Sequence, residues 1–137
     1  MVSKNTGNRT SFLDIERLFH GMPQTKFEIP EALEAEWLKI AIADYELSVG
    51  VELDYDPVIR EFSTELPMTV CRTLAQMMYE YYLQRELSRV MALNGIYGKD
   101  ITLTGQDATK RVTKQELDSQ HALVETLLHR QKTHSYN

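Results

Sequence analysis

Three side chains near the C-terminus have a spacing that suggests metal chemistry. His121, Glu125 and His129 are four residues apart, so on a helix all three lie along one side. Imidazole and carboxylate groups are ligands for Zn²⁺ and other divalent cations. The row is too long for three ligands to reach one ion comfortably, and its glutamate does not adjoin the first histidine as in zinc proteases. We therefore expect a polar helix face, or histidines that hydrogen-bond across a subunit contact, and we predict no metal site here.

Alternating carboxylates in the middle of the chain are the second candidate. Glu52, Asp54 and Asp56 precede Pro57 and would point to one side of an extended segment. A calcium loop would need more oxygen ligands and a glycine at its sharp turn. Paired carboxylates for hydrolysis would need an apolar pocket that raises one pKa. A solvated acidic edge is the expected structure.

No strong catalytic signature occurs in the sequence. It has no glycine-rich phosphate loop, dinucleotide fingerprint, nucleophile elbow or paired-cysteine zinc pattern. Cys71, the only cysteine, lies in an apolar stretch, so we predict a small buried side chain and not a reactive thiol. We therefore expect a protein that is not an enzyme and needs no cofactor.

A concentration of tyrosine and methionine favours an interaction surface. Tyr79, Tyr81 and Tyr82 lie close to Met77 and Met78 in one predicted helix. Adjacent helical residues point about 100° apart, so at least one tyrosine must face outward or into a partner. Tyrosine is well suited to protein interfaces because its ring is apolar and its hydroxyl is polar.

Four amphipathic segments must position these residues, and they predict a mainly α fold, a small helical bundle with one long central helix. Serine and proline mark helix starts, glycine marks helix ends, and Thr113 to Glu116 has the pattern of a capping box. The expected ranges are 11–20, 30–49, 67–94 and 113–131. The longest would span about 40 Å at 1.5 Å per residue, which suggests subunit contacts.

Two segments interrupt the helical pattern. Residues 51–57 alternate apolar and acidic side chains, which predicts a short extended segment that ends at Pro57. Residues 96–105 contain β-branched residues between Gly98 and Gly105, which predicts a strand or hairpin arm, and Gly105 to Asp107 is predicted to be a turn. The expected organisation is a flexible N-terminal arm (1–10), a single helical domain (11–131) and a polar C-terminal tail (132–137).

Charge is unevenly distributed along the 137 residues, whose net charge is −5. Residues 28–65 contain eleven carboxylates against only Lys39 and Arg60. Copies that met head to tail could set this acidic part against a more basic one. Non-specific nucleic-acid binding depends on clustered cations, and the group Lys99, Lys110, Arg111 and Lys114 is small. The polar N-terminus and short apolar runs predict a cytoplasmic protein without a membrane segment.

The C-terminal half resembles small structural proteins of tailed bacteriophages. The resemblance covers roughly residues 67–137 and rests on the overall residue pattern, not on a diagnostic motif. The segments that carry it are Tyr81–Arg89 (YYLQRELSR), Asn94–Ile101 (NGIYGKDI) and Leu127–Asn137 (LLHRQKTHSYN). The family is that of head–tail connector (neck adaptor) proteins. It implies a mostly helical, non-enzymatic subunit, often in a ring of about a dozen copies under the portal protein. Such a ring extends the DNA channel, through which DNA passes without sequence-specific binding, and docks the next neck or tail protein.

The resemblance gives the predicted surfaces their roles. The long helix would touch neighbouring subunits, the arm at 96–105 would pair with an adjacent copy, and the tail would dock into the portal and become ordered only on assembly. The expected location is the host cytoplasm during assembly and then the virion neck. The residues predicted to contact other subunits or partners are Tyr79, Tyr82, Arg85, Arg89, Ile101, Leu103, His129, Arg130, Lys132, His134 and Tyr136.

Three other functions stay open at this point. A helical adaptor or regulatory module would bind a single protein partner through the tyrosine and methionine surface. A metal protein would use the row of His121, Glu125 and His129. A DNA-binding protein would use the cations before the last helix and would show strongly salt-dependent affinity.

Overall fold

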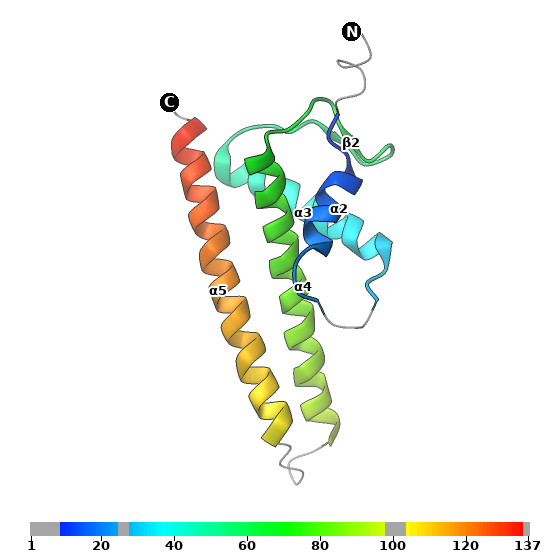
Figure 1. Ribbon diagram of the computed structural model, residues 1–137, viewed down its shortest axis with the longest axis vertical. Helices are drawn as coiled ribbons and strands as arrows, with labels where there is room; N and C mark the ends of the chain where they lie inside the picture. Colours follow the sequence, from blue (N-terminus) through cyan, green and yellow to red (C-terminus); the bar gives the residue numbers. More distant parts are fainter. Residues whose placement is uncertain (1–8, 25–27, 98–103, 136–137) are drawn as a thin grey trace.

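Helices dominate the computed structural model, which describes residues 9–24, 28–97 and 104–135, with side chains for 9–24, 28–92 and 111–132 (Figure 1). Within these ranges the helices are α2 (Phe12–His20), α3 (Glu31–Val49), α4 (Met68–Tyr97) and α5 (Thr104–Ser135). The strands β1 (Tyr55–Asp56) and β2 (Glu61–Phe62) form one small hairpin. The predicted mainly α fold, a small helical bundle with a long central helix, is confirmed.

Helix α2 begins and ends at the residues that the sequence predicts. Ser11 is its N-cap in extended backbone, and the Asp14 carboxylate accepts a hydrogen bond of 2.9 Å from the Ser11 N–H. Gly21 follows its last residue. The predicted apolar face, Phe12, Ile15 and Phe19, is fully buried. The helix therefore contributes a complete aromatic and aliphatic stripe to the core.

Helix α3 lies between Pro30 and Gly50, as predicted. Pro30 has no N–H to lose at this end, and Gly50 takes the left-handed conformation (φ 81°) that ends many helices. The helix buries a wide apolar face, formed by Trp37, Leu38, Ala41, Ile42, Tyr45 and Val49. Ile40 is 47% exposed and lies outside this face.

The predicted extended segment contains β1 and pairs with a strand that the sequence did not predict. Tyr55 lies opposite Phe62 and Asp56 opposite Glu61, and Pro57 follows β1 directly. Ser11 extends this pairing through an antiparallel bridge to Glu61.

The last residue of the predicted N-terminal arm, Thr10, is hydrogen-bonded to residues 62 and 66. Thr10 is buried, and its carbonyl accepts a hydrogen bond of 2.8 Å from the Phe62 N–H. Its hydroxyl accepts a second of 2.8 Å from the Leu66 N–H. These partners satisfy the polar groups of Thr10, and the flexibility of the arm at 1–10 stays a prediction. Residues 1–8 lie outside the described part.

The two longest helices, α4 and α5, lie side by side and run antiparallel (Figure 1). Three predicted boundaries are wrong. Helix α4 passes Gly95 and reaches Tyr97, α5 begins at Thr104 and not at Thr113, and α5 continues past Gln131 to Ser135. The predicted turn at 105–107 is therefore helical. A glycine inside a helix costs only about 1 kcal/mol relative to alanine, so Gly95 and Gly105 are weak stops.

The arm predicted at 96–105 is helical at both ends, and its centre, residues 98–103, lies outside the described part. Of the predicted tail, residues 132–135 belong to α5. Tyr136 and Asn137 also lie outside the described part.

Helices α2 and α3 pack against only part of α4 (Figure 1). The buried apolar residues of α4 concentrate in 71–83, where Cys71, Leu74, Ala75, Met77, Met78, Tyr82 and Leu83 join the main core. In residues 84–92 only Glu86 and Val90 are buried. We define two regions. The body consists of α2, α3, the β1–β2 hairpin, α4 up to Leu83 and α5 from Gln120. The projecting hairpin consists of residues 84–97 of α4 and 104–119 of α5.

Candidate functional site

The tyrosines of the predicted interaction surface make contacts within the chain. Tyr82 is buried at 2% exposure, with its ring edge-on to Phe19 at 6.2 Å and stacked on Tyr79 at 5.6 Å. The Tyr79 hydroxyl donates a 2.8 Å hydrogen bond to the Pro23 carbonyl, and the Tyr81 hydroxyl donates one of 2.9 Å to Asp44. We remove Tyr82 from the proposed surface because it has almost no exposed area. Burial raises the pKa of Tyr79 and of Tyr81.

The two predicted arginines lie on the projecting hairpin. Both are exposed, and Arg89 donates hydrogen bonds of 3.1 and 2.8 Å to the Glu86 carboxylate one turn before it. Arg89, but not Arg85, borders a groove of about 230 Å³ between α4 and α5, at the point where the body gives way to the projecting hairpin. Pro23 and Tyr79 line its body side, and Val90 and Thr113 line its far side.

The other predicted contact residues divide by position. His129, Arg130 and Lys132 are exposed near the end of α5, on the body. His134 belongs to α5, but its side chain lies outside the described ranges, as do Ile101, Leu103 and Tyr136. The structure therefore places the candidate contacts in two groups along the α4–α5 pair, one near Arg85, where the projecting hairpin begins, and one near Lys132, toward the C-terminal end of α5.

The row of His121, Glu125 and His129 does not converge on a single point. His121 Nδ1 lies 3.0 Å from Glu80 Oε2 of α4, and His121 Nε2 lies 3.9 Å from Glu125 Oε1. The hydrogen bond with Glu80, its negative charge and those of Glu125 and Asp118 raise the pKa of His121. His121 therefore makes a polar contact between α5 and α4.

The alternating carboxylates do not lie along one regular extended strand. Asp54 has a left-handed backbone (φ 54°), which ends any regular extended run before β1. Asp56 Oδ1 accepts a 2.9 Å hydrogen bond from the Val58 N–H and so stabilises the hairpin turn. Glu52, Asp54 and Asp56 are all exposed, as expected for a solvated acidic edge.

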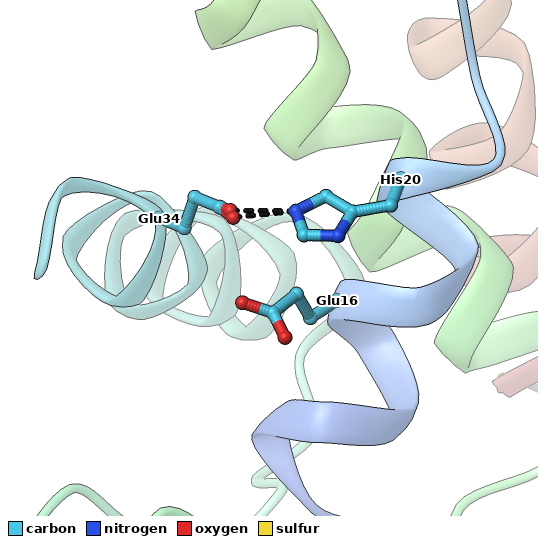
Figure 2. Close-up of side chains that lie close together, drawn as sticks. All are labelled: Glu16, His20 and Glu34. Atoms are coloured by element: carbon cyan, nitrogen blue, oxygen red, sulfur yellow. Dashed lines mark hydrogen bonds and ion pairs between the residues drawn. The ribbon is translucent and has the colours of Figure 1, made fainter. Parts of the chain in front are cut away.

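One cluster of metal-ligand type occurs within the described ranges, and the sequence analysis did not find it. Glu16 and His20 project from α2 toward Glu34 of α3 (Figure 2). His20 Nε2 lies 2.7 and 2.8 Å from the two oxygens of the Glu34 carboxylate, which is only 2% exposed. Burial raises the pKa of Glu34 even though His20 opposes that shift, and the Glu16 charge adds to it.

The signal for this cluster was partly available in the sequence. Glu16 and His20 are four residues apart on the predicted first helix, which puts them on one face. Glu34 lies fourteen residues further along, on a different helix, so the crossing of α2 and α3 had to be known.

Three comparisons with known proteins give no further assignment. The chain matches no protein-family model, and it has no significant match among curated proteins or among solved structures. In the described ranges, no helix has the length and apolar character needed to cross a bilayer.

Proposed function

We propose that this chain is a structural subunit of a tailed-phage neck, a head–tail connector that forms a ring beneath the portal protein and docks the next neck or tail component. The observation that carries the proposal is the projecting α4–α5 hairpin. Its helices extend beyond the body (Figure 1), and each presents an exposed apolar residue, Met91 at 50% and Val112 at 52%. The sequence resemblance covers the same two helices.

Helices that project with apolar side chains exposed are typical of surfaces that become buried on assembly. A small protein gains little by extending a two-helix hairpin into water, because neither helix has a third element to cover it. A neighbouring copy supplies that cover. The groove beside Arg89 and Val90 gives the neighbour a recess into which an apolar side chain fits.

Charge favours a head-to-tail arrangement of copies. The projecting hairpin exposes Arg85 and Arg111, whereas residues 28–65 of the body carry most of the carboxylates of the chain. Opposite charges on different parts of one molecule suit a heterologous contact, which closes into a ring when the rotation between copies permits. Raising the salt concentration should therefore weaken assembly.

Mass measurement by light scattering over a concentration series tests the proposal, first alone and then with portal protein. A large, stoichiometric complex with portal supports a connector. A monomer or dimer that ignores portal contradicts it and favours the single-partner adaptor.

A matched pair of variants locates the contact surface. Met91→Glu puts a charge on the projecting hairpin and should prevent the large complex while leaving the helical circular dichroism unchanged. Leu13→Glu is the control, since Leu13 is similarly exposed (53%) but lies on α2 of the body. Equal effects of the two substitutions would argue against the projecting hairpin as the contact surface.

A further inference from the structure

The cluster of Glu16, His20 and Glu34 joins two helices by side chains that all offer metal-ligand atoms. One such atom from each residue lies within 4.8 Å of those from the other two. Glu16 and His20 come from successive turns of α2, and Glu34 comes from the first turns of α3 (Figure 2). The three side chains therefore converge from two separate segments of the chain, which ordinary helix-surface pairs do not do.

The charge balance of the cluster distinguishes it from a simple ion pair. Glu34 is 2% exposed, and within the described part of the chain the groups acting on its carboxylate are His20 and a second carboxylate, Glu16. Arg17, next to Glu16 in sequence, is 79% exposed and lies 3.8 Å from Asp14. Even a protonated His20 leaves one of the two negative charges unbalanced. Buried carboxylates are costly without compensating positive charge.

We propose that Glu16, His20 and Glu34 bind a divalent transition-metal ion of the Zn²⁺ class, which links α2 to α3. One imidazole nitrogen with two carboxylate oxygens suits Zn²⁺, whereas Mg²⁺ and Ca²⁺ prefer oxygen ligands alone. Glu16 is only half-buried and the His20 side chain is 51% exposed, so water has access to the remaining coordination positions. This site is separate from the proposed assembly surface and does not depend on it.

Binding requires a small local change. His20 Nε2 is now 2.7 Å from Glu34 Oε1, a hydrogen-bond distance, whereas two ligands of a tetrahedral Zn²⁺ with bonds of about 2.0–2.1 Å are about 3.3 Å apart. The Nε2 proton must leave, and the metal replaces it between nitrogen and oxygen. A change of this size is within the reach of side-chain rotation, because His20 ends α2 and is exposed.

Titration of Zn²⁺ into the untagged, chelator-treated full chain by isothermal calorimetry tests the proposal. We expect one Zn²⁺ per chain and a higher unfolding temperature with Zn²⁺ than with Mg²⁺. Glu16→Gln keeps the size of the side chain and should weaken binding at least about tenfold. His20→Gln should weaken it further. Because Glu16 is half-buried, Glu16→Gln should fold even if changes at His20 or Glu34 do not.

His121→Gln is the matched control, since it also removes a histidine that contacts a glutamate between two helices. Its Zn²⁺ affinity should equal that of the unchanged chain. The proposal is overturned if the unchanged chain binds no Zn²⁺, which would leave the cluster as a proton-bridged pair. Binding that survives Glu16→Gln and His20→Gln but is lost in His121→Gln would place the metal on the α5 row and also overturn it.

Discussion

The two halves of α4 belong to the same helix but differ in what covers them. Between Cys71 and Leu83, α4 packs against α2, α3 and α5, and seven of its apolar side chains join the core. From Gln84 to Ala92 only Glu86 and Val90 are buried. The helical periodicity of α4 therefore builds the core of the monomer between Cys71 and Leu83, whereas in residues 84–92 it leaves the apolar side chain of Met91 50% exposed.

Polar contacts divide in the same way. In the body they connect different helices: Gln120 Nε2 donates a 2.8 Å hydrogen bond to the Gln76 carbonyl, and Gln131 joins Tyr45 of α3 to Thr73 of α4. In the projecting hairpin, Arg89 pairs with Glu86 and Lys114 pairs with Asp118, each within one helix. Pairs of this kind stabilise a single helix.

Leucine truncation at two points of α4 should show the largest difference between the two regions. Leu74 is fully buried in the body, whereas Leu87 is half-buried in the projecting hairpin. Leu74→Ala should lower the free energy of unfolding by about 2–5 kcal/mol, because it leaves a cavity. Leu87→Ala should lower the free energy of unfolding by roughly 1 kcal/mol, because the Leu87 side chain buries less apolar area than that of Leu74. Urea unfolding measures both, and equal losses would contradict the division into two regions.

Gln131→Ala tests whether polar contacts hold α5 to the body. The substitution leaves the buried Tyr45 and Thr73 hydroxyls without the Gln131 side chain, so we expect a loss of about 1–3 kcal/mol in the free energy of unfolding. Gln115→Ala is the control, since Gln115 is exposed on the projecting part of the same helix. If Gln131→Ala lowers the free energy of unfolding no more than Gln115→Ala does, the hydrogen bonds of Gln131 do not stabilise the fold.

Gly50→Ala tests the end of α3, where the chain turns toward the hairpin. A Cβ at Gly50 would meet no atom within 4 Å, so the expected loss of about 1 kcal/mol in unfolding free energy comes from the left-handed backbone (φ 81°) alone. Asparagine adopts the left-handed conformation more readily than alanine does, so Gly50→Asn should lower the unfolding free energy less than Gly50→Ala. Thermal unfolding distinguishes the two, and a stabilised Gly50→Ala protein would show that the turn is not held in this conformation.

The smallest predicted effect is a pH dependence at the boundary between the two regions. Glu80 of α4 and Glu125 and Asp118 of α5 hold the pKa of His121 above its usual 6.5. A raised folded-state pKa gives stabilisation that is complete below about pH 6.5 and is lost as the pH rises through the folded-state value. Because His121 is exposed, we expect a change of at most a few tenths of a kcal/mol.

Unfolding measured between pH 6 and 8.5 tests this effect. In His121→Gln, the free energy of unfolding should change less with pH at the alkaline end of this range. An unchanged slope in this variant would assign the pH dependence to other groups.

The sequence predicted the helices of the body well, because their ends carry strong local signals. Ser11, Pro30 and Gly50 mark helix ends by backbone chemistry that needs no tertiary information. The boundaries of α4 and α5 were less accurate. Their packing against each other over many residues outweighs weak local signals such as Gly95 and Thr113, and a pairing partner cannot be inferred from a single segment.

The candidate sites were harder to predict for the same reason. Local spacing singled out His121, Glu125 and His129, which lie on one helix, and missed Glu34, whose partners lie on another. The same limitation placed Tyr82 on the surface, although Phe19 covers it. Side chains that meet across helices depend on crossing geometry, which periodicity does not contain.

Hydrogen exchange of the backbone amides, in the free chain and in the complex with portal protein, tests most directly whether the projecting hairpin is an assembly surface. In the free chain we expect strong protection at 71–83 and weak protection at 84–92 and 111–117. On assembly, protection should rise in the two weakly protected segments and stay unchanged at 71–83. Uniform protection along α4 in the free chain, or no rise at 84–92 in the complex, would contradict the account.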